Sequence, residues 1–310
     1  MVKQVKHLRT HRKGAKRGLK FKAGSKPIIS TRSANVNAFA ILQRPVAFKK
    51  FLKNYLVETK LEFKPAGMRM IGMDPANVAL IDVLCKTGPE GVFLSIAKPE
   101  IIGVNIKSLT DLFKNAKKDE VWLFSIEGTD LILSGPHGKF NLPLLKVEDM
   151  DQKEPITKES LDRINAGIKF SAGINSHEFN RVVSDASSVA ESITFTGKKE
   201  GIDFKAKEDL TGSEGSILGV TNGGSAKAKY SIEYLKKLKP LADLFENINL
   251  RFGDNHVLMI TAGTNLASFM FILAPRVDSD EVSAPEVKPV EVPRPIPGGV
   301  TSLPEKNEVK

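Results

Sequence analysis

LEFKPAGMRMIGMD at residues 61–74 and VALIDVLC at residues 78–85 decide the fold class of this chain. Both are short apolar runs of the kind that form strands, and Gly67 marks a turn inside the first run. An apolar stripe at helical spacing precedes them at residues 44–59. The order is therefore a helix followed by several short strands.

The second half of the chain repeats this order. A helical pattern at residues 174–192 leads into ITFTGKKEGIDFKA at residues 193–206, as the pattern at 44–59 leads into the first strands. Helical patterns at 106–119 and 230–239 likewise precede strand patterns. Because the helix starts recur about 125 to 130 residues apart, internal duplication is the simplest explanation. We predict an α+β fold of two duplicated domains, with a strand-rich layer and four helices per subunit.

Composition divides the chain into five segments. Residues 1–32 hold 11 Lys and Arg and no acid, and the chain from Asp278 onward contains six prolines, so neither end can build a packed core. The stretch KVEDMDQKEPITKESLD is polar and charged, which is typical of a linker. The predicted segments are a basic disordered extension at 1–34, a first domain at 35–146, a linker at 147–166, a second domain at 167–277 and a proline-rich disordered tail at 278–310.

The distribution of charge is more informative than its total of +10. Without the two ends, residues 33–276 carry 31 bases and 29 acids. The four helical segments hold a net charge of +8, and the remainder of this core holds −6. If the helices line one surface, that surface attracts a polyanion through its backbone and does not read its sequence.

Several kinds of site are excluded by the residues present. Cys85 lies in an apolar strand pattern, which favours a buried thiol over a nucleophile. His7 and His11 have no second pair of ligands that would complete a zinc site. Asp74 and Asp82 are expected to serve turn and surface roles, since no acid–base or nucleophilic spacing accompanies them. No apolar run approaches the roughly 20 residues that span a bilayer. We expect no enzyme activity, catalytic residue, cofactor, metal or membrane contact.

Four stretches carry a resemblance to a known family. They are GMRMIGMDPANVALIDV at 67–83, IIGVNIKSLTDLFKNAKKDE at 101–120, YSIEYLKKL at 230–238 and FILAPRV at 271–277. The chain resembles sliding clamps of the proliferating cell nuclear antigen family, and archaeal members most of all. FILAPRV is the most specific of the four stretches.

The resemblance covers roughly residues 35–277 and implies a ring. In such a ring two-domain subunits close head to tail into a trimer, and their helices line a hole that encircles duplex DNA. Residues near 131–144 and within 202–220 are the expected edge strands at the subunit contacts. Homotrimer and heterotrimer both remain open.

The resemblance also implies two sets of functional residues. The pocket for partner peptides is assigned to Met73, Leu80, Met150, Ala274 and Pro275. Ile272 stands where many relatives have tyrosine. The DNA-binding set is Lys49, Lys50, Lys53, Lys114, Lys117, Arg181, Lys236, Lys237 and Lys239.

The leading hypothesis is a DNA polymerase processivity factor that encircles duplex DNA without sequence specificity. Its expected partners are DNA polymerase, a clamp loader, ligase and flap nuclease, each held through a short peptide motif. The alternative is a monomeric nucleic-acid-binding interaction module that uses the basic N-terminal arm. The expected location is the cytoplasm, with the nucleoid, for an archaeal protein and the nucleus for a eukaryotic one.

Overall fold

A computed structural model describes residues 38–42, 45–52, 56–88, 92–96, 98–117, 120–150 and 156–276 of the 310-residue chain. The predicted extension at 1–34 and the predicted tail at 278–310 lie outside the described residues. No helix in the described part is long and apolar enough to cross a membrane.

The first half of the described chain combines two helices with many strands. The helices are α1 (Pro45–Leu52) and α2 (Ile106–Leu112). The strands are β1 (Ala38–Leu42), β2 (Glu58–Lys64), β3 (Gly67–Met73), β4 (Ala79–Lys86), β5 (Val92–Ile96), β6 (Glu100–Asn105), β7 (Trp122–Glu127), β8 (Asp130–Gly135) and β9 (Gly138–Pro143).

The second half follows a connector that contains the 3-10 turn η1 (Val147–Asp149) and helix α3 (Lys158–Gly167). Its helices are α4 (Ser176–Ala186), α5 (Ile232–Lys236) and the 3-10 helix η2 (Lys239–Asp243). Its strands are β10 (Phe170–Asn175), β11 (Ser192–Lys198), β12 (Gly201–Lys207), β13 (Gly212–Leu218), β14 (Val220–Gly223), β15 (Lys227–Ser231), β16 (Asn247–Phe252), β17 (Leu258–Gly263) and β18 (Ala267–Leu273).

The two halves share one order of elements. Each runs through one strand, a helix, five strands, a second helix and three strands. The sheets repeat as well, since β14-β10-β16-β17-β18 in the second half matches β5-β1-β7-β8-β9 in the first. In the same way β13-β12-β11-β15 matches β4-β3-β2-β6. The predicted α+β fold with internal duplication is confirmed.

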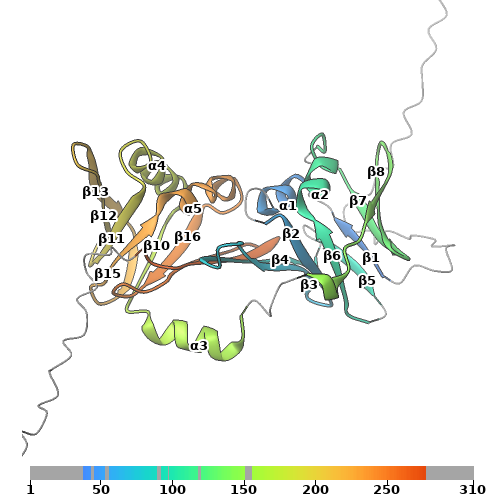
Figure 1. Cartoon of the computed structure of the whole chain (residues 1–310), viewed down its shortest axis with the longest axis horizontal. Coiled ribbons are helices and arrows are strands. Elements are labelled where there is room, and N and C mark those ends of the chain that lie inside the picture. Colours follow the sequence, from blue (N-terminus) through green and yellow to red (C-terminus); the bar gives the residue numbers. More distant parts are fainter. Residues whose placement is uncertain are drawn as a thin grey trace, which may run out of the picture.

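One antiparallel pairing joins the halves into a continuous nine-stranded sheet, between β18 and β4. Helices α1, α2, α4 and α5 lie along one side of the sheets, and α3 lies on the opposite side (Figure 1). Alternate residues of β4, from Ala79 to Cys85, face the helices and belong to the main core. Burial raises the pKa of the Cys85 thiol to about 12, so this thiol is a protonated core group, as predicted.

All four predicted helices are longer than the observed ones, because tertiary contacts override the helical periodicity. Of the helix predicted at 44–59, the described residues show α1 as far as Leu52, and Glu58 already pairs in β2. The helix predicted at 106–119 stops at Leu112, where the buried Phe113 ends the regular hydrogen bonding. The helices predicted at 174–192 and 230–239 shorten to α4 and α5, and Pro240 lies in η2.

The connector departs most from the prediction. Residues 147–166 were expected to form a polar linker, and four helices were expected per subunit. The described residues contain a fifth α-helix, α3, which begins within that linker and ends one residue after it. The Thr157 side chain caps its first turn by accepting from the Ser160 N–H. Leu161 and Ile164 supply an apolar side that packs on the sheet, so the polar composition concealed an amphipathic helix.

Asp74 connects the two halves at the turn between β3 and β4. Its carboxylate accepts the backbone N–H groups of Ala76, Val78 and Ala79, and also the Tyr234 hydroxyl of α5 at 2.7 Å. Partial burial raises the pKa of Asp74, but these hydrogen bonds outweigh it and hold that pKa below its usual value. The same hydrogen bond raises the pKa of Tyr234 to about 12.

Replacing Tyr234 with Phe is expected to lower the free energy of unfolding by about 1.5 kcal/mol or more, because it removes a hydrogen bond to a charged group. Since the folded pKa of Asp74 is lowered, its contribution is present above the unfolded value of about 4 and is lost as pH falls through the folded pKa. Urea unfolding of both proteins from neutral to acid pH tests this. A stability difference that does not shrink in acid would contradict the assignment to the ionised carboxylate.

Candidate functional site

The predicted bases gather on one side of the molecule. We call this side the helical face: the exposed sides of α1, α2, α4 and α5 with the turns after α2 and α5 (Figure 1). Lys49 and Lys50 lie in α1, Arg181 in α4 and Lys236 in α5. Lys114 and Lys117 follow α2, Lys237 follows α5, and Lys239 begins η2. Lys53 lies outside the described residues.

The charge is not spread along the helices as predicted, because the charged segments were longer than the helices. Lys107 is balanced by Asp111 within α2, and Glu233 of α5 pairs with Lys237, which follows that helix. Lys114 follows α2 and Lys236 ends α5, and the helix dipole favours cations at such C-terminal ends. Apart from Arg181 within α4, the helical face therefore presents its positive charge at helix ends.

Two of the predicted bases contact acids of the chain itself. Lys50 forms an ion pair with Asp243 of η2, with the Nζ and Oδ2 atoms 2.5 Å apart, which links the two halves. The hydrogen bond from Lys50 is the main reason that the pKa of Asp243 lies below its usual value. Lys237 lies 3.4 Å from Glu233 and over the Tyr234 ring. The exposed members of the set are Lys114, Lys117, Arg181, Lys236 and Lys239.

A second surface lies on the opposite side of the sheets. Strand register places Met73 opposite Leu80, Leu80 opposite Ile272, and Ile272 opposite Met259. These four side chains form one line across β3, β4, β18 and β17, and they belong to an apolar cluster separate from the main core. We call this line the outer apolar row.

Four of the five residues assigned to the peptide pocket are close together. Met73 and Leu80 belong to the outer apolar row, and Ala274 and Pro275 directly follow β18 beside it. The Ala274 N–H donates to Val78 O at 2.8 Å, which holds this segment against the start of β4. Met150 is separate, because it lies over Gly103 of β6, two strands away from β3.

The fold and the register can now be compared with known proteins. No family model matches the chain. The chain is 27% identical to the DNA polymerase sliding clamp of Archaeoglobus fulgidus over 233 residues, which is 72% of this chain and 91% of that protein. It is 28% identical to DNA polymerase sliding clamp 1 of Thermococcus kodakarensis over 239 residues, 73% of this chain and 91% of that protein.

Comparison with solved structures finds the same fold in two sliding clamps. The A. fulgidus clamp bound to the C-terminal region of FEN-1 matches 78% of this chain and 99% of its own, with a TM-score of 0.69 and 19% identity. The clamp of Entamoeba histolytica matches 78% of this chain and 100% of its own, with a TM-score of 0.68 and 18% identity. In sequence and in fold the chain is similar to sliding clamps of the proliferating cell nuclear antigen family. Its likeness to archaeal clamps was predicted and is confirmed.

The chain has one feature that its sequence did not lead us to expect. Ile156, Leu161, Ile164 and Ile168, which lie in and beside α3, pack against the outer apolar row. Met259 and Ile272 also belong to the row, although neither was assigned to the pocket. The alternation of apolar residues in β17 and β18 could have identified them, since every second side chain of a strand faces the same way.

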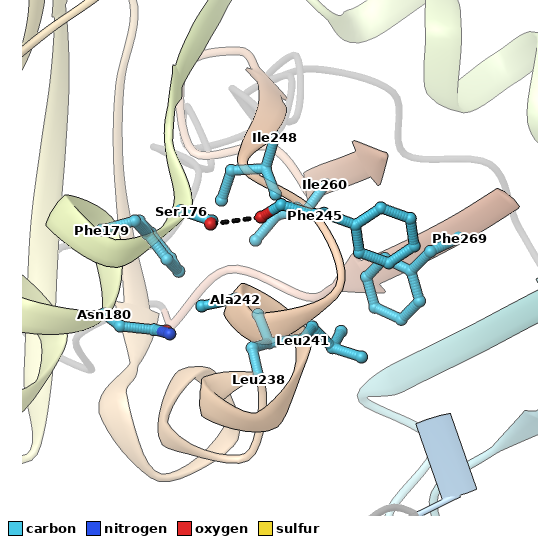
Figure 2. A pocket seen from close by; sticks show the side chains of 10 residues that line it. All are labelled: Ser176, Phe179, Asn180, Leu238, Leu241, Ala242, Phe245, Ile248, Ile260 and Phe269. Atoms are coloured by element: carbon cyan, nitrogen blue, oxygen red, sulfur yellow. Dashed lines mark hydrogen bonds between the residues drawn. The ribbon is translucent and has the colours of Figure 1, made fainter. Parts of the chain in front are cut away.

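A cavity under η2 is unsuitable for a ligand. It encloses about 10 Å³ and is lined mainly by apolar side chains, among them Phe179, Leu241 and Phe269 (Figure 2). Its polar side chains already have partners: the Ser176 hydroxyl donates to the Phe245 carbonyl (Figure 2), and the Asn180 amide donates to the Lys239 carbonyl. A volume of that order holds about one water at most.

Proposed function

We propose that this clamp closes head to tail into a ring around duplex DNA and tethers DNA polymerase, ligase and flap nuclease without catalysing a reaction itself. The observation that carries the proposal is the repeated sheet. Inside the chain β18 pairs with β4, and their counterparts β9 and β13 are the end strands of their sheets. The pairing that joins the halves can therefore recur between subunits.

Such a contact is heterologous, because one copy offers β9 and the next offers β13. A heterologous contact generates a ring when its rotation closes. Pairing also removes two exposed strand edges, which otherwise invite aggregation. Three subunits are proposed here by analogy with the family, and an ATP-driven loader is the expected means of opening the ring.

The register inside the chain predicts the register between subunits. A Cβ built at Gly67 would lie 2.1 Å from a carbonyl oxygen of β4, and one at Gly201 would lie 2.0 Å from a carbonyl oxygen of β13. The two glycines are therefore equivalent. Each glycine has a strand partner, in β4 for Gly67 and in β13 for Gly201. The residues four positions before these partners are Asp82 and Glu214, which are therefore equivalent.

The same comparison aligns the other edge. Leu142 of β9 and Leu273 of β18 each pair with a leucine near the start of the preceding strand. Leu142 and Leu273 are therefore equivalent positions. The residues three positions before them, Lys139 and Met270, are equivalent as well. Because Met270 lies opposite Asp82 inside the chain, Lys139 of one copy is expected to lie opposite Glu214 of the next.

Reversing one of these charges is expected to weaken the ring. Lys139→Glu or Glu214→Lys alone places like charges opposite each other, which we expect to shift the dissociation midpoint by about 2- to 5-fold per interface. The two changes combined in one chain should restore the midpoint if the ring contains copies of that chain. Sedimentation velocity over a concentration series measures the midpoint, with Lys158→Glu on α3 as the control.

If the chain is strictly monomeric at micromolar concentration and no second clamp subunit exists to complete a ring, the proposed homotrimer is refuted. Weakening by both single changes without restoration in the double variant would instead support a ring of different chains. The third possible result, no effect of either change, refutes the proposed register.

For DNA, we propose that the helical face surrounds the duplex. The exposed Lys114, Lys117, Arg181 and Lys236 come from both halves. They belong to or follow α2, α4 and α5, and these helices lie on one side of the sheets (Figure 1). Lysine and arginine contacts to phosphates give affinity without sequence readout. This favours a ring that slides along DNA.

For partners, we propose that the outer apolar row anchors peptide motifs. The solved A. fulgidus clamp holds the C-terminal region of FEN-1. Met73 and Met259 suit such a surface, because the flexible thioether adapts to different side chains. The DNA polymerase, the clamp loader, ligase and flap nuclease are the proposed partners.

The basic N-terminal arm offers a second candidate function, in which the arm alone binds nucleic acid. Deleting residues 1–32 separates the two proposals. Loss of all DNA association with no effect on self-association would favour the arm. A clamp that lacks these residues should still stimulate a polymerase.

A further inference from the structure

The outer apolar row is covered by the chain itself. Leu80, Ile272 and Met259 are only 5%, 6% and 2% exposed, although they face away from the main core. Leu161 and Ile164 of α3 pack against them, and α3 lies alone on this side of the sheets among the labelled helices (Figure 1). A partner peptide could not reach this row while α3 is in place.

We infer that α3 is an internal competitor for partner peptides, which occupies the outer apolar row and must move away before a peptide can bind there. The inference rests on the proposed function of this row as the peptide site. Leu161 and Ile164 are three residues apart, so they project from the same side of a helix. They supply the kind of paired apolar anchor that a helical peptide inserts into a groove.

The C-terminal end of α3 is fixed to the body of the clamp. The Ile164 carbonyl lies 2.9 Å from His256 Nε2, and the His256 carbonyl accepts the Tyr230 hydroxyl at 2.8 Å. A Cβ at Gly167 would lie 2.5 Å from the same histidine ring. The end near Gly167 therefore stays close to the turn between β16 and β17.

The rest of α3 is held more weakly. No residue of α3 is fully buried. The hydrogen bonds of its first-turn side chains stay local: the Thr157 hydroxyl accepts the Ser160 N–H and also shares a hydrogen bond with the Ser160 hydroxyl. Its polar side carries Lys158 and Arg163 against Glu159 and Asp162, so net charge does not hold it to the sheet. Segments with few buried contacts open locally without global unfolding, and α3 can leave the row by breaking the Ile164–His256 hydrogen bond and turning about the end near Gly167.

This arrangement lowers the apparent affinity for every peptide. When the competent state has a small population, the observed dissociation constant rises by the inverse of that population. If α3 covers the row for about 90% to 99% of the time, freeing the row should tighten peptide binding by about 10- to 100-fold. The affinity of the clamp for its partners would then be set by α3.

The test compares two double variants of the full chain with the wild type. Leu161→Asp with Ile164→Asp removes both anchors, whereas Asn165→Asp with Ala166→Asp makes the same charge change on exposed residues of α3. The probe is a labelled C-terminal peptide of FEN-1 followed by fluorescence anisotropy. We expect the anchor variant to bind about 10-fold tighter or better, and the exposed variant to bind like the wild type.

Equal affinity of all three proteins would overturn the role of α3 and leave the peptide site standing. Absence of binding in all three, at peptide concentrations up to millimolar, would instead overturn the proposed peptide site and the inference with it. If the anchor variant keeps its tighter peptide binding after Ile272→Asp is added, the peptide binds away from the row. That result would also overturn the inference.

A second variant avoids new charge. His256→Ala removes the partner of the Ile164 carbonyl and is expected to tighten peptide binding, by less than the anchor variant. Hydrogen exchange provides the independent readout: the amides of α3 should exchange faster in both variants, and also in the wild type when the peptide is added. Unchanged exchange in α3 at saturating peptide would show that the peptide binds without displacing it.

Discussion

Reversing three exposed bases of the helical face, with Lys114→Glu, Lys117→Glu and Lys236→Glu, is expected to lower the affinity for linear duplex DNA by about 100-fold or more. In a three-subunit ring the change removes up to nine candidate phosphate contacts. Each lost contact should also flatten the plot of log affinity against log salt by about 0.9. Fluorescence anisotropy between 50 and 200 mM salt, which spans about the range where this slope is steep, measures both quantities.

The matched control reverses three exposed bases of the connector and α3. Lys146→Glu, Lys158→Glu and Arg163→Glu make the same change in net charge, and α3 lies on the opposite side of the sheets. This variant should keep most of the affinity and almost the full salt slope. Equal losses in the two variants would mean that DNA responds to total charge, and the helical face would lose its assigned role.

The strands were predictable because they carry their signal locally. The run at 61–74 becomes β2 and β3, and the run at 78–85 closely matches β4. Helix ends were not predictable in the same way. The helical patterns run on to residues 59 and 119, yet Glu58 already pairs in β2 and the buried Phe113 follows the last helical residue of α2. Such contacts join segments far apart in the chain, and a single stretch of sequence does not contain them.

The site was predictable where the family motif and the register coincide. Met73 and Leu80 lie side by side because they are strand partners across the turn at Asp74. Helix α3, which covers them, was not predicted, because Leu161 and Ile164 are surrounded in the sequence by Lys, Glu, Asp and Arg. Two signals could have indicated α3: the capping residue Thr157, and the apolar spacing that continues to Ile168.

Phe113 joins the core to the helical face. It is fully buried, and its ring centroid lies 5.0 Å from that of Trp122, 5.8 Å from that of Phe124 and 6.2 Å from that of Phe48. It also directly follows α2 and precedes Lys114. The same side chain therefore fills the aromatic core of the first half and fixes the end of the helix that carries exposed charge.

Phe113→Ala is expected to lower the free energy of unfolding by about 3 to 5 kcal/mol, because it removes a fully buried ring and leaves a cavity among its aromatic neighbours. For a folded region of this size that corresponds to a fall in Tm of about 6 to 20 °C. Differential scanning calorimetry measures the shift, and Phe113→Leu should cost less than half as much because it leaves a smaller cavity. Since a loosened core also frees the end of α2, the Ala variant should bind DNA more weakly at temperatures well below its Tm. Full DNA affinity in that variant would show that Lys114 keeps its place without Phe113.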